Sequence, residues 1–195
     1  MIPLDFLSKA GLFTRAEFLS GNRCAGICLE MRNAERAEAE VYGTDAPAVN
    51  RAIRTASEVE LRAAQAVEIA QRIAALQPDL EDHFRVTLTG CEEPTFLVYA
   101  AGGFYRPHRD RSLPADAAAG DARARRVSTV LFLNDDYTGG ALTLYGLVKD
   151  PAWRDYGFAV TPAPGLLVAF ASDLLHEVTP VIAGERCTVA NWFRA

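Results

Sequence analysis

The sequence has few of the residues that most often build metal and redox sites. It contains three histidines and four cysteines in 195 residues. The cysteines form no CxxC doublet, so the paired ligands of a structural zinc site are missing. We therefore expect free, reduced thiols and a cytoplasmic protein; the cysteines are Cys24, Cys28, Cys91 and Cys187.

Long apolar runs and excess positive charge are also missing. No apolar run approaches the roughly 20 residues that a membrane-spanning helix needs. The opening Met1-Ile-Pro-Leu-Asp-Phe lacks the basic start and apolar stretch of a secretory leader. A net charge of -5 argues against a phosphate-binding face. We expect one domain over residues 1–195, with neither a nucleic-acid nor a membrane partner.

The N-terminal part, about residues 1–80, has helical patterns. Thr14 and Glu17 fit a capping box, and Phe13 and Phe18 fit the hydrophobic staple that flanks such a box. These residues predict a helix that runs to about Arg32.

A second capping box, at Ser57 and Glu60, precedes an apolar stripe at helical spacing. The predicted helix ends before Pro78, because the residue before a proline is disfavoured in the α region. Residues 39–42 are expected to form a short strand.

From about residue 84 the pattern changes to short β-prone runs separated by turn residues. Many short strands with long connections favour a jelly roll over a simple meander. We expect an α+β fold, with a jelly-roll core at about 84–195 supported by the N-terminal helices. Residues 112–126 lack periodicity and are expected to form a lid. The predicted strands are 84–90, 95–99, 127–133, 141–145, 166–170, 176–179 and 188–193.

Two of the three histidines can form one metal site with a carboxylate. His108 and Asp110 are two residues apart, so on an extended strand they project to the same face. His176 follows an apolar strand and a tight turn. Two histidines and one carboxylate are the ligand set of the facial triad that holds non-haem Fe(II). His83 has no partner spacing and is expected at the surface.

An arginine suited to binding a carboxylate follows the third candidate ligand. Arg186 lies ten residues after His176, and Thr188 follows on the same strand face. A guanidinium can hold the distal carboxylate of a dicarboxylate with two hydrogen bonds, and a hydroxyl can add another.

Residues from about 95 to 193 resemble the 2-oxoglutarate- and Fe(II)-dependent dioxygenases, in their prolyl 4-hydroxylase-like branch. The resemblance implies a double-stranded β-helix (jelly-roll) barrel, with His108, Asp110 and His176 as iron ligands. It also implies that Arg186 binds the 2-oxoglutarate C5 carboxylate and that Tyr99 flanks it. The matching segments are Tyr99-x-x-Gly-Gly-x-Tyr105-x-Pro-His108-x-Asp110, Leu133-Asn-Asp-Asp, Gly139-Gly140-Ala-Leu-Thr-Leu, Pro164-Gly165, His176-x-Val178-x-Pro180-Val181 and Gly184-x-Arg186 leading to Asn191-Trp192.

The same resemblance implies cofactors and a reaction. Fe(II), 2-oxoglutarate and O2 would hydroxylate an unactivated C–H bond with release of succinate and CO2, and ascorbate is a candidate reductant. Asp110 favours hydroxylation, because the related halogenases leave that position open for halide. Phe132 aligns with a tyrosine that helps to hold 2-oxoglutarate in some members, and Thr188 is the candidate replacement for its hydroxyl.

The sequence does not identify the substrate. The branch includes enzymes that act on prolyl residues in proteins and enzymes that act on free amino acids or other small molecules. A second hypothesis is a non-catalytic jelly-roll binding module with a vestigial metal site. The candidate pocket residues are Tyr105, Arg106, Arg109 and Trp192, with Arg111 as a third arginine near the motif.

Overall fold

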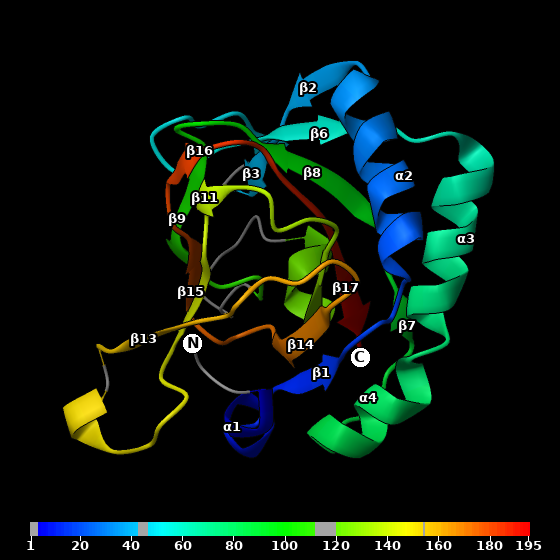
Figure 1. Ribbon diagram of the computed structural model, residues 1–195. Coiled ribbons are helices and arrows are strands. Elements are labelled where there is room, and N and C mark those ends of the chain that lie inside the picture. Colours follow the sequence, from blue (N-terminus) through cyan, green and yellow to red (C-terminus); the bar gives the residue numbers. More distant parts are fainter. Residues whose placement is uncertain (1–3, 43–46, 112–119, 154) are drawn as a thin grey trace.

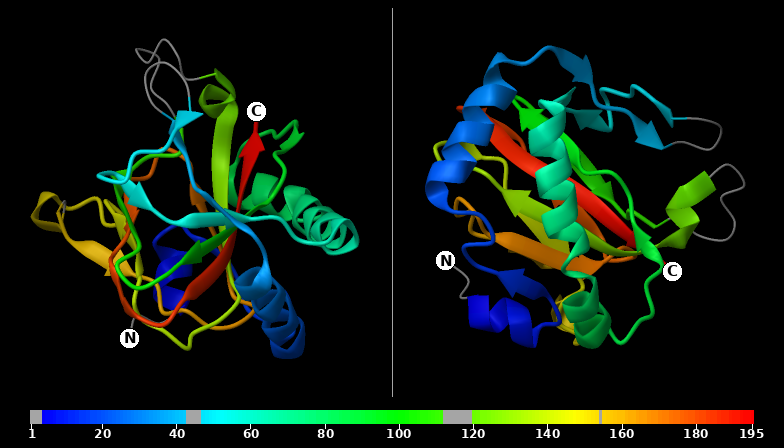
Figure 2. Two further views of the ribbon diagram at one scale, coloured as in Figure 1. Left: turned by 90° about the horizontal axis from the view of Figure 1, so that it is seen from above. Right: turned by 90° about the vertical axis from the view of Figure 1, so that its right-hand side faces the viewer.

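The computed structural model describes residues 4–42, 47–111, 120–153 and 155–195. Two antiparallel sheets pack against each other, and helices α2 and α3 lie across the outer face of the larger one (Figure 1, Figure 2). No helix in these ranges is long and apolar enough to cross a membrane.

The larger sheet has the strand order β1-β14-β10-β17-β8-β6-β2, and the short β7 pairs with β17. Its strands are β1 (Phe13–Arg15), β2 (Arg36–Glu38), β6 (Ser57–Val59), β7 (Gly90–Cys91), β8 (Thr95–Tyr99), β10 (Arg125–Phe132), β14 (Leu167–Ala171) and β17 (Arg186–Arg194).

The smaller sheet has the order β13-β12-β15-β9-β5. Its strands are β5 (Arg54–Thr55), β9 (Phe104–His108), β12 (Leu142–Tyr145), β13 (Gly157–Ala159) and β15 (His176–Val178). Two further pairs are β3 (Val41–Tyr42) with β4 (Pro47–Ala48), and β11 (Thr138–Gly139) with β16 (Val181–Ala183).

From β8 onward the chain alternates between the two sheets. Strands β8, β10, β14 and β17 belong to the larger sheet, whereas β9, β12, β13 and β15 belong to the smaller one. This alternation is the double-stranded β-helix that the sequence predicted. Within the described ranges the two sheets do not join into one closed barrel.

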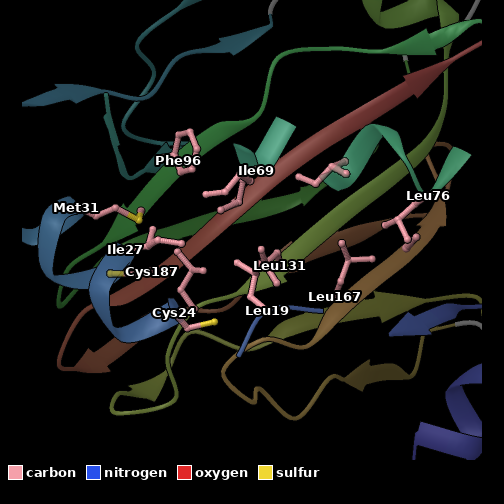
Figure 3. Close-up of a cluster of buried hydrophobic side chains, with 14 of the residues drawn as sticks. Leu19, Cys24, Ile27, Met31, Ile69, Leu76, Phe96, Leu131, Leu167 and Cys187 are labelled. Atoms are coloured by element: carbon pink, nitrogen blue, oxygen red, sulfur yellow. The ribbon is translucent and has the colours of Figure 1, made fainter. Parts of the chain in front are cut away.

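Two apolar cores hold these layers. Between the sheets, Phe132 and Phe170 of the larger sheet pack with Leu144 of the smaller one. Outside the larger sheet, helices α2 (Gly21–Asn33) and α3 (Ala63–Ala74) cover a second core (Figure 3). Ile27 and Ile69 are completely buried there. The remaining helical elements are α1 (Leu4–Lys9), α4 (Gln77–Phe84) and the 3-10 turns η1 (Gly120–Ala124) and η2 (Pro151–Trp153).

The first predicted helix begins later than expected. The predicted capping box at Thr14 and Glu17 is wrong, because Phe13–Arg15 form β1 and pair with β14. Helix α2 starts at Gly21, and the Ser20 hydroxyl accepts a bond from the Arg23 backbone N–H. Sheet pairing therefore overrides the local capping signal.

The second capping box is also wrong. Ser57–Val59 form β6 between β8 and β2, and α3 begins only at Ala63. Helix α3 ends at Ala74, before Pro78, as predicted, and Pro78 lies in the first turn of α4, where a missing N–H costs nothing. The strand predicted at 84–90 is wrong in most of its length, because Phe84 ends α4 and only β7 follows.

The predicted lid at 112–126 is largely outside the described residues. Its end, 120–126, forms η1 and the start of β10. All four cysteines are free, as the sequence predicted.

A close backbone approach explains the Pro164-Gly165 motif before β14. Gly165 has φ +85°, and a Cβ at this position would lie 2.0 Å from the Leu19 carbonyl oxygen. The Gly165 carbonyl also accepts a hydrogen bond from the Phe18 N–H at 2.9 Å. The glycine thereby joins the segment before α2 to the sheet.

Gly165→Ala should therefore lower the free energy of unfolding by about 3–5 kcal/mol, through left-handed strain plus a backbone clash. Urea denaturation measures this loss. Gly146→Ala is the matched control, because Gly146 has φ +72° but its Cβ would meet no atom within 4 Å. The control should lose only about 1–2 kcal/mol. Equal losses in the two variants would contradict the proposed clash.

Candidate metal centre and its pocket

The two predicted histidine ligands lie on neighbouring strands of the smaller sheet. His108 ends β9, and His176 begins β15 directly opposite it in the antiparallel register. Their ring centroids are 4.2 Å apart. Residues paired in this way project to the same face of a sheet, so strand pairing alone brings the two imidazoles together.

Asp110 completes the cluster from just beyond the end of β9. Its two carboxylate oxygens lie 3.5 Å from the Nε2 atoms of His108 and His176. All three ligand atoms lie within 4.8 Å of one another. The sequence placed Asp110 on the strand itself, which is wrong, although the carboxylate still turns toward the histidines.

Backbone carbonyls orient both imidazoles. Nδ1 of His108 lies 2.8 Å from the Arg106 oxygen, and Nδ1 of His176 lies 3.0 Å from the Leu174 oxygen. Because a carbonyl only accepts, each Nδ1 carries the proton and each Nε2 keeps a free lone pair. Both lone pairs therefore belong to the atoms that face Asp110.

Burial sets the protonation of the cluster. It lowers the pKa of His176 to about 4, so this imidazole is neutral at neutral pH. Burial alone would raise the pKa of Asp110, but the adjacent His176 and His108 rings hold it well below its usual range. An ionised carboxylate beside a neutral imidazole is the state that binds a cation. Two nitrogens and one oxygen fit Fe(II) and leave coordination positions open.

Arg186 lies in the wall of the same pocket, at the start of β17. Its side chain is 2% exposed. One terminal N–H donates to the Thr188 hydroxyl at 3.1 Å, whereas Nε is buried without a hydrogen-bond partner. The guanidinium carbon lies 5.1 Å from the Tyr99 ring centre and 5.4 Å from that of Phe132. A buried cation with an unused donor is suited to an anionic ligand.

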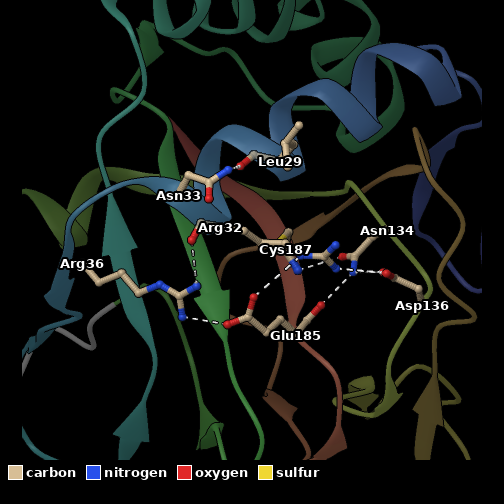
Figure 4. A network of polar contacts seen from close by, with 8 residues as sticks. All are labelled: Leu29, Arg32, Asn33, Arg36, Asn134, Asp136, Glu185 and Cys187. Carbon is tan, nitrogen blue, oxygen red and sulfur yellow. Dashed lines mark hydrogen bonds and ion pairs between the residues drawn. The ribbon is translucent and has the colours of Figure 1, made fainter.

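A polar network fixes the start of β17 (Figure 4). The Asn134 side chain accepts a hydrogen bond from the Cys187 N–H at 2.8 Å and donates to the Glu185 carbonyl at 2.7 Å. The residue between these two contacts is Arg186. Arg32, at the end of α2, pairs with Asp136 at 3.0 Å. The Leu133-Asn-Asp-Asp segment therefore positions Arg186.

The candidate pocket residues divide into two groups. Tyr105 and Trp192 are among the residues that line the pocket. Arg106 and Arg109 do not, and this part of the prediction is wrong. Their side chains turn away and donate to the backbone oxygens of Ala52 and Asp173. The full lining is Glu40, Arg54, Leu97, Tyr99, Tyr105, His108, Asp110, Arg125, Thr129, Val130, Leu142, His176, Val178, Arg186, Thr188, Ala190 and Trp192.

Two arginines of the pocket wall were not found from the sequence. Arg125 makes a buried ion pair with Glu92, and its guanidinium carbon lies 3.9 Å from the Trp192 ring centre. Arg54 comes from β5, in a region expected to be helical support. No sequence pattern indicated Arg54, because its place depends on the pairing of β5 with β9, which lies about fifty residues further along the chain. His83, with Nε2 3.2 Å from the Gly11 oxygen, takes no part in the cluster.

Comparison with known proteins identifies the family. The family model described as the 2OG-Fe(II) oxygenase superfamily matches residues 94–194, which include the whole cluster and Arg186. The chain belongs to this superfamily. Its members use Fe(II), 2-oxoglutarate and O2, which fits the donor set of the cluster.

Its relatives support the prolyl 4-hydroxylase-like type within this superfamily. A PKHD-type hydroxylase of Maricaulis maris is 36% identical over 99 residues, or 50% of this chain and 39% of that protein. A second, from Synechococcus elongatus, is 36% identical over 103 residues, or 51% and 42%. The chain thus matches about two fifths of the length of these relatives.

Solved structures match almost the whole chain. A Pseudomonas putida prolyl-4-hydroxylase has 26% identity and a TM-score of 0.72, with 98% of this chain and 96% of that chain covered. A Trichoplax adhaerens prolyl hydroxylase, solved with a hypoxia inducible factor peptide, shares the fold. It has 20% identity and a TM-score of 0.75, with 98% and 86% covered.

The Asn134 contacts can be tested by stability. Asn134→Ala should lower the free energy of unfolding by about 2–3 kcal/mol, because it removes the side-chain partner of a buried N–H and of a carbonyl. Chemical denaturation measures the change. Asn33→Ala is the control, since the Asn33 amide donates to Leu29 at an exposed site. The control should change stability by no more than about 0.5 kcal/mol, and a comparable loss there would argue against the role of Asn134.

Proposed function

We propose that this protein is a 2-oxoglutarate-dependent Fe(II) hydroxylase of an unactivated C–H bond. The observation that carries the proposal is a single pocket lined by both the His-Asp-His cluster and the buried, incompletely bonded Arg186. A metal site and an anion site in one pocket are what a chelating dicarboxylate cosubstrate requires. Membership in the superfamily supports the same assignment.

In this proposal His108, Asp110 and His176 hold Fe(II). Each histidine contributes Nε2, and the carbonyls of Arg106 and Leu174 keep those nitrogens in the binding tautomer. Asp110 contributes negative charge that offsets part of the cation's charge. When bound, Fe(II) and 2-oxoglutarate supply the oxidising chemistry with O2 and release succinate and CO2.

Arg186 is the proposed anchor for the distal carboxylate of 2-oxoglutarate. Its burial makes a charge-assisted hydrogen bond stronger than it would be in water. Thr188 holds one of its terminal nitrogens, and the ring of Tyr99 lies beside it. Phe132 contacts the same guanidinium but offers no hydroxyl, so Thr188 is the proposed replacement.

The proposed substrate is a prolyl residue of a peptide or an amino-acid-like small molecule. Support comes from the prolyl-4-hydroxylase of Pseudomonas putida and from the peptide bound to the Trichoplax adhaerens protein. Tyr105 and Trp192 are proposed walls of the substrate space. Ascorbate as a reductant and a cytoplasmic location remain predictions.

Removal of the carboxylate ligand tests the metal site. Asp110→Ala should abolish succinate formation and weaken Co(II) binding by at least about tenfold, because groups that only orient metal ligands already contribute about 10–100-fold. Visible absorption of Co(II) under anaerobic conditions measures binding independently of turnover.

His83→Ala is the matched control, since this histidine lies outside the cluster. It should bind Co(II) like the wild type. Full metal affinity in Asp110→Ala would contradict the enzyme hypothesis, and so would a wild type that bound neither metal nor 2-oxoglutarate. The binding-module hypothesis would then take its place.

Arg186→Gln tests the cosubstrate anchor. The loss of the guanidinium should raise the KM for 2-oxoglutarate by about 10–100-fold, the equivalent of about 1.5–3 kcal/mol for a charged hydrogen bond. Co(II) affinity should change little. Succinate assays at varied 2-oxoglutarate, with calorimetric binding to the anaerobic Mn(II) protein, separate the two effects. Equal and mild effects of Asp110→Ala and Arg186→Gln would contradict both assigned roles.

A further inference from the structure

Arg54 brings a second guanidinium to the pocket from the N-terminal part of the chain. β5 pairs with β9 so that Arg54 lies opposite Tyr105. The Arg54 guanidinium carbon is 4.8 Å from the Tyr105 ring centre, and this ring stacks on His108 with centroids 3.5 Å apart. Arg54 is therefore one aromatic ring away from the metal cluster.

The donors of Arg54 are only partly used. One terminal N–H donates to the Glu40 backbone oxygen at 2.9 Å, and the Tyr99 hydroxyl is a further partner of the guanidinium, whereas Nε is buried without a hydrogen-bond partner. Among the residues that the structure describes, no carboxylate forms an ion pair with Arg54, and Glu58 attracts it only at longer range.

Other arginines nearby differ from Arg54 in this respect. Arg125, in the same pocket wall, is paired with Glu92 at 2.6 Å. Arg51, three residues before Arg54, is paired with Glu38. Arg54 therefore has no carboxylate in ion-pair distance at a position that faces the site pocket.

The position of Arg54 separates it from the proposed cosubstrate anchor. Arg54 is partly exposed, whereas Arg186 is 2% exposed and lies deep in the pocket. A ligand held by Arg186 and the metal cluster would leave Arg54 facing the remaining space. In the proposed function this remaining space takes the substrate.

We propose that Arg54 binds a carboxylate of the substrate and so selects carboxylate-bearing substrates. This inference rests on the proposed function. The carboxylate has two possible sources, the α-carboxylate of a free or N-blocked amino acid and an acidic side chain beside the target residue of a peptide. The ion pair forms at the Arg54 guanidinium, which the ring of Tyr105 keeps in place.

Matched pairs of compounds test this selection. N-acetyl-L-proline and its amide differ in the carboxylate alone, and prolyl peptides with a neighbouring Asp or Asn form the second pair. Calorimetry on the anaerobic Mn(II)–2-oxoglutarate protein measures binding, and substrate-dependent succinate gives kcat/KM. We expect the wild type to favour the carboxylate member of at least one pair by about 10–100-fold, the range for one charge-assisted hydrogen bond. The pair that shows the preference identifies the source.

Three variants assign the preference to Arg54. Arg54→Met should remove it, and Arg54→Lys should restore part of it, because lysine keeps the charge but loses the planar fork. Arg51→Met, the control with an exposed and paired side chain, should keep the full preference. A preference that survives in Arg54→Met, or a wild type that favours neither carboxylate compound, overturns the inference.

The measurements also separate this inference from the function on which it rests. If the wild type binds 2-oxoglutarate but does not distinguish the members of either pair, only the role of Arg54 fails. If the wild type does not bind 2-oxoglutarate, the proposed function fails. If Arg54→Met weakens the binding of 2-oxoglutarate, Arg54 belongs to the cosubstrate site. The inference is then overturned as well.

Discussion

The antiparallel pairing of β9 with β15 is the constraint on which the site depends. It sets His108 opposite His176 and turns both side chains to one face. A shift of this register by one residue would move one histidine to the other face of the sheet and separate the ligands. Because β12 and β5 flank this pair on its two sides, both strands are held in the sheet interior. The arrangement of the candidate ligands is therefore a consequence of sheet assembly.

Buried charges in this protein fall into two groups that have different uses. The Arg125–Glu92 pair is internally compensated, since both side chains are nearly buried and Glu92 also accepts from Arg194. Such a pair stabilises the structure only as long as both partners remain. Arg54 and Arg186 instead keep a buried nitrogen without a partner. Folding leaves these donors unsatisfied, and a ligand can recover that cost on binding.

The core of the site was predictable from the sequence because its pattern is local. The strand at 95–99 was predicted with its observed bounds, and those containing Leu131, Leu144 and Val168 were predicted within a few residues. Apolar runs between glycine and proline turns carry that information. The triad followed from one His-x-Asp and the scarcity of histidine.

The N-terminal half was less predictable for a physical reason. Strands β1, β2, β5 and β6 contain only two or three residues each, and they form because each finds an edge or a neighbour in a sheet built from distant residues. The capping signals at Thr14 and Ser57 were real local preferences that such pairings override. No local pattern could indicate that Arg54 would lie opposite Tyr105.

These short strands position Arg54, the residue proposed to select the substrate. β5 extends the smaller sheet beyond β9, and β6 extends the larger sheet beyond β8, with Ala56 as the one residue between them. The Ala56 carbonyl accepts from Ala39, which ties this crossing point to the segment that carries Glu40. The backbone of Arg54 is thus held close to the point where the chain passes from one sheet to the other. The backbone oxygen of Glu40 accepts a hydrogen bond from its guanidinium. The strands from β8 onward supply the groups proposed for chemistry, and the strands added before them supply the group proposed for choice of substrate.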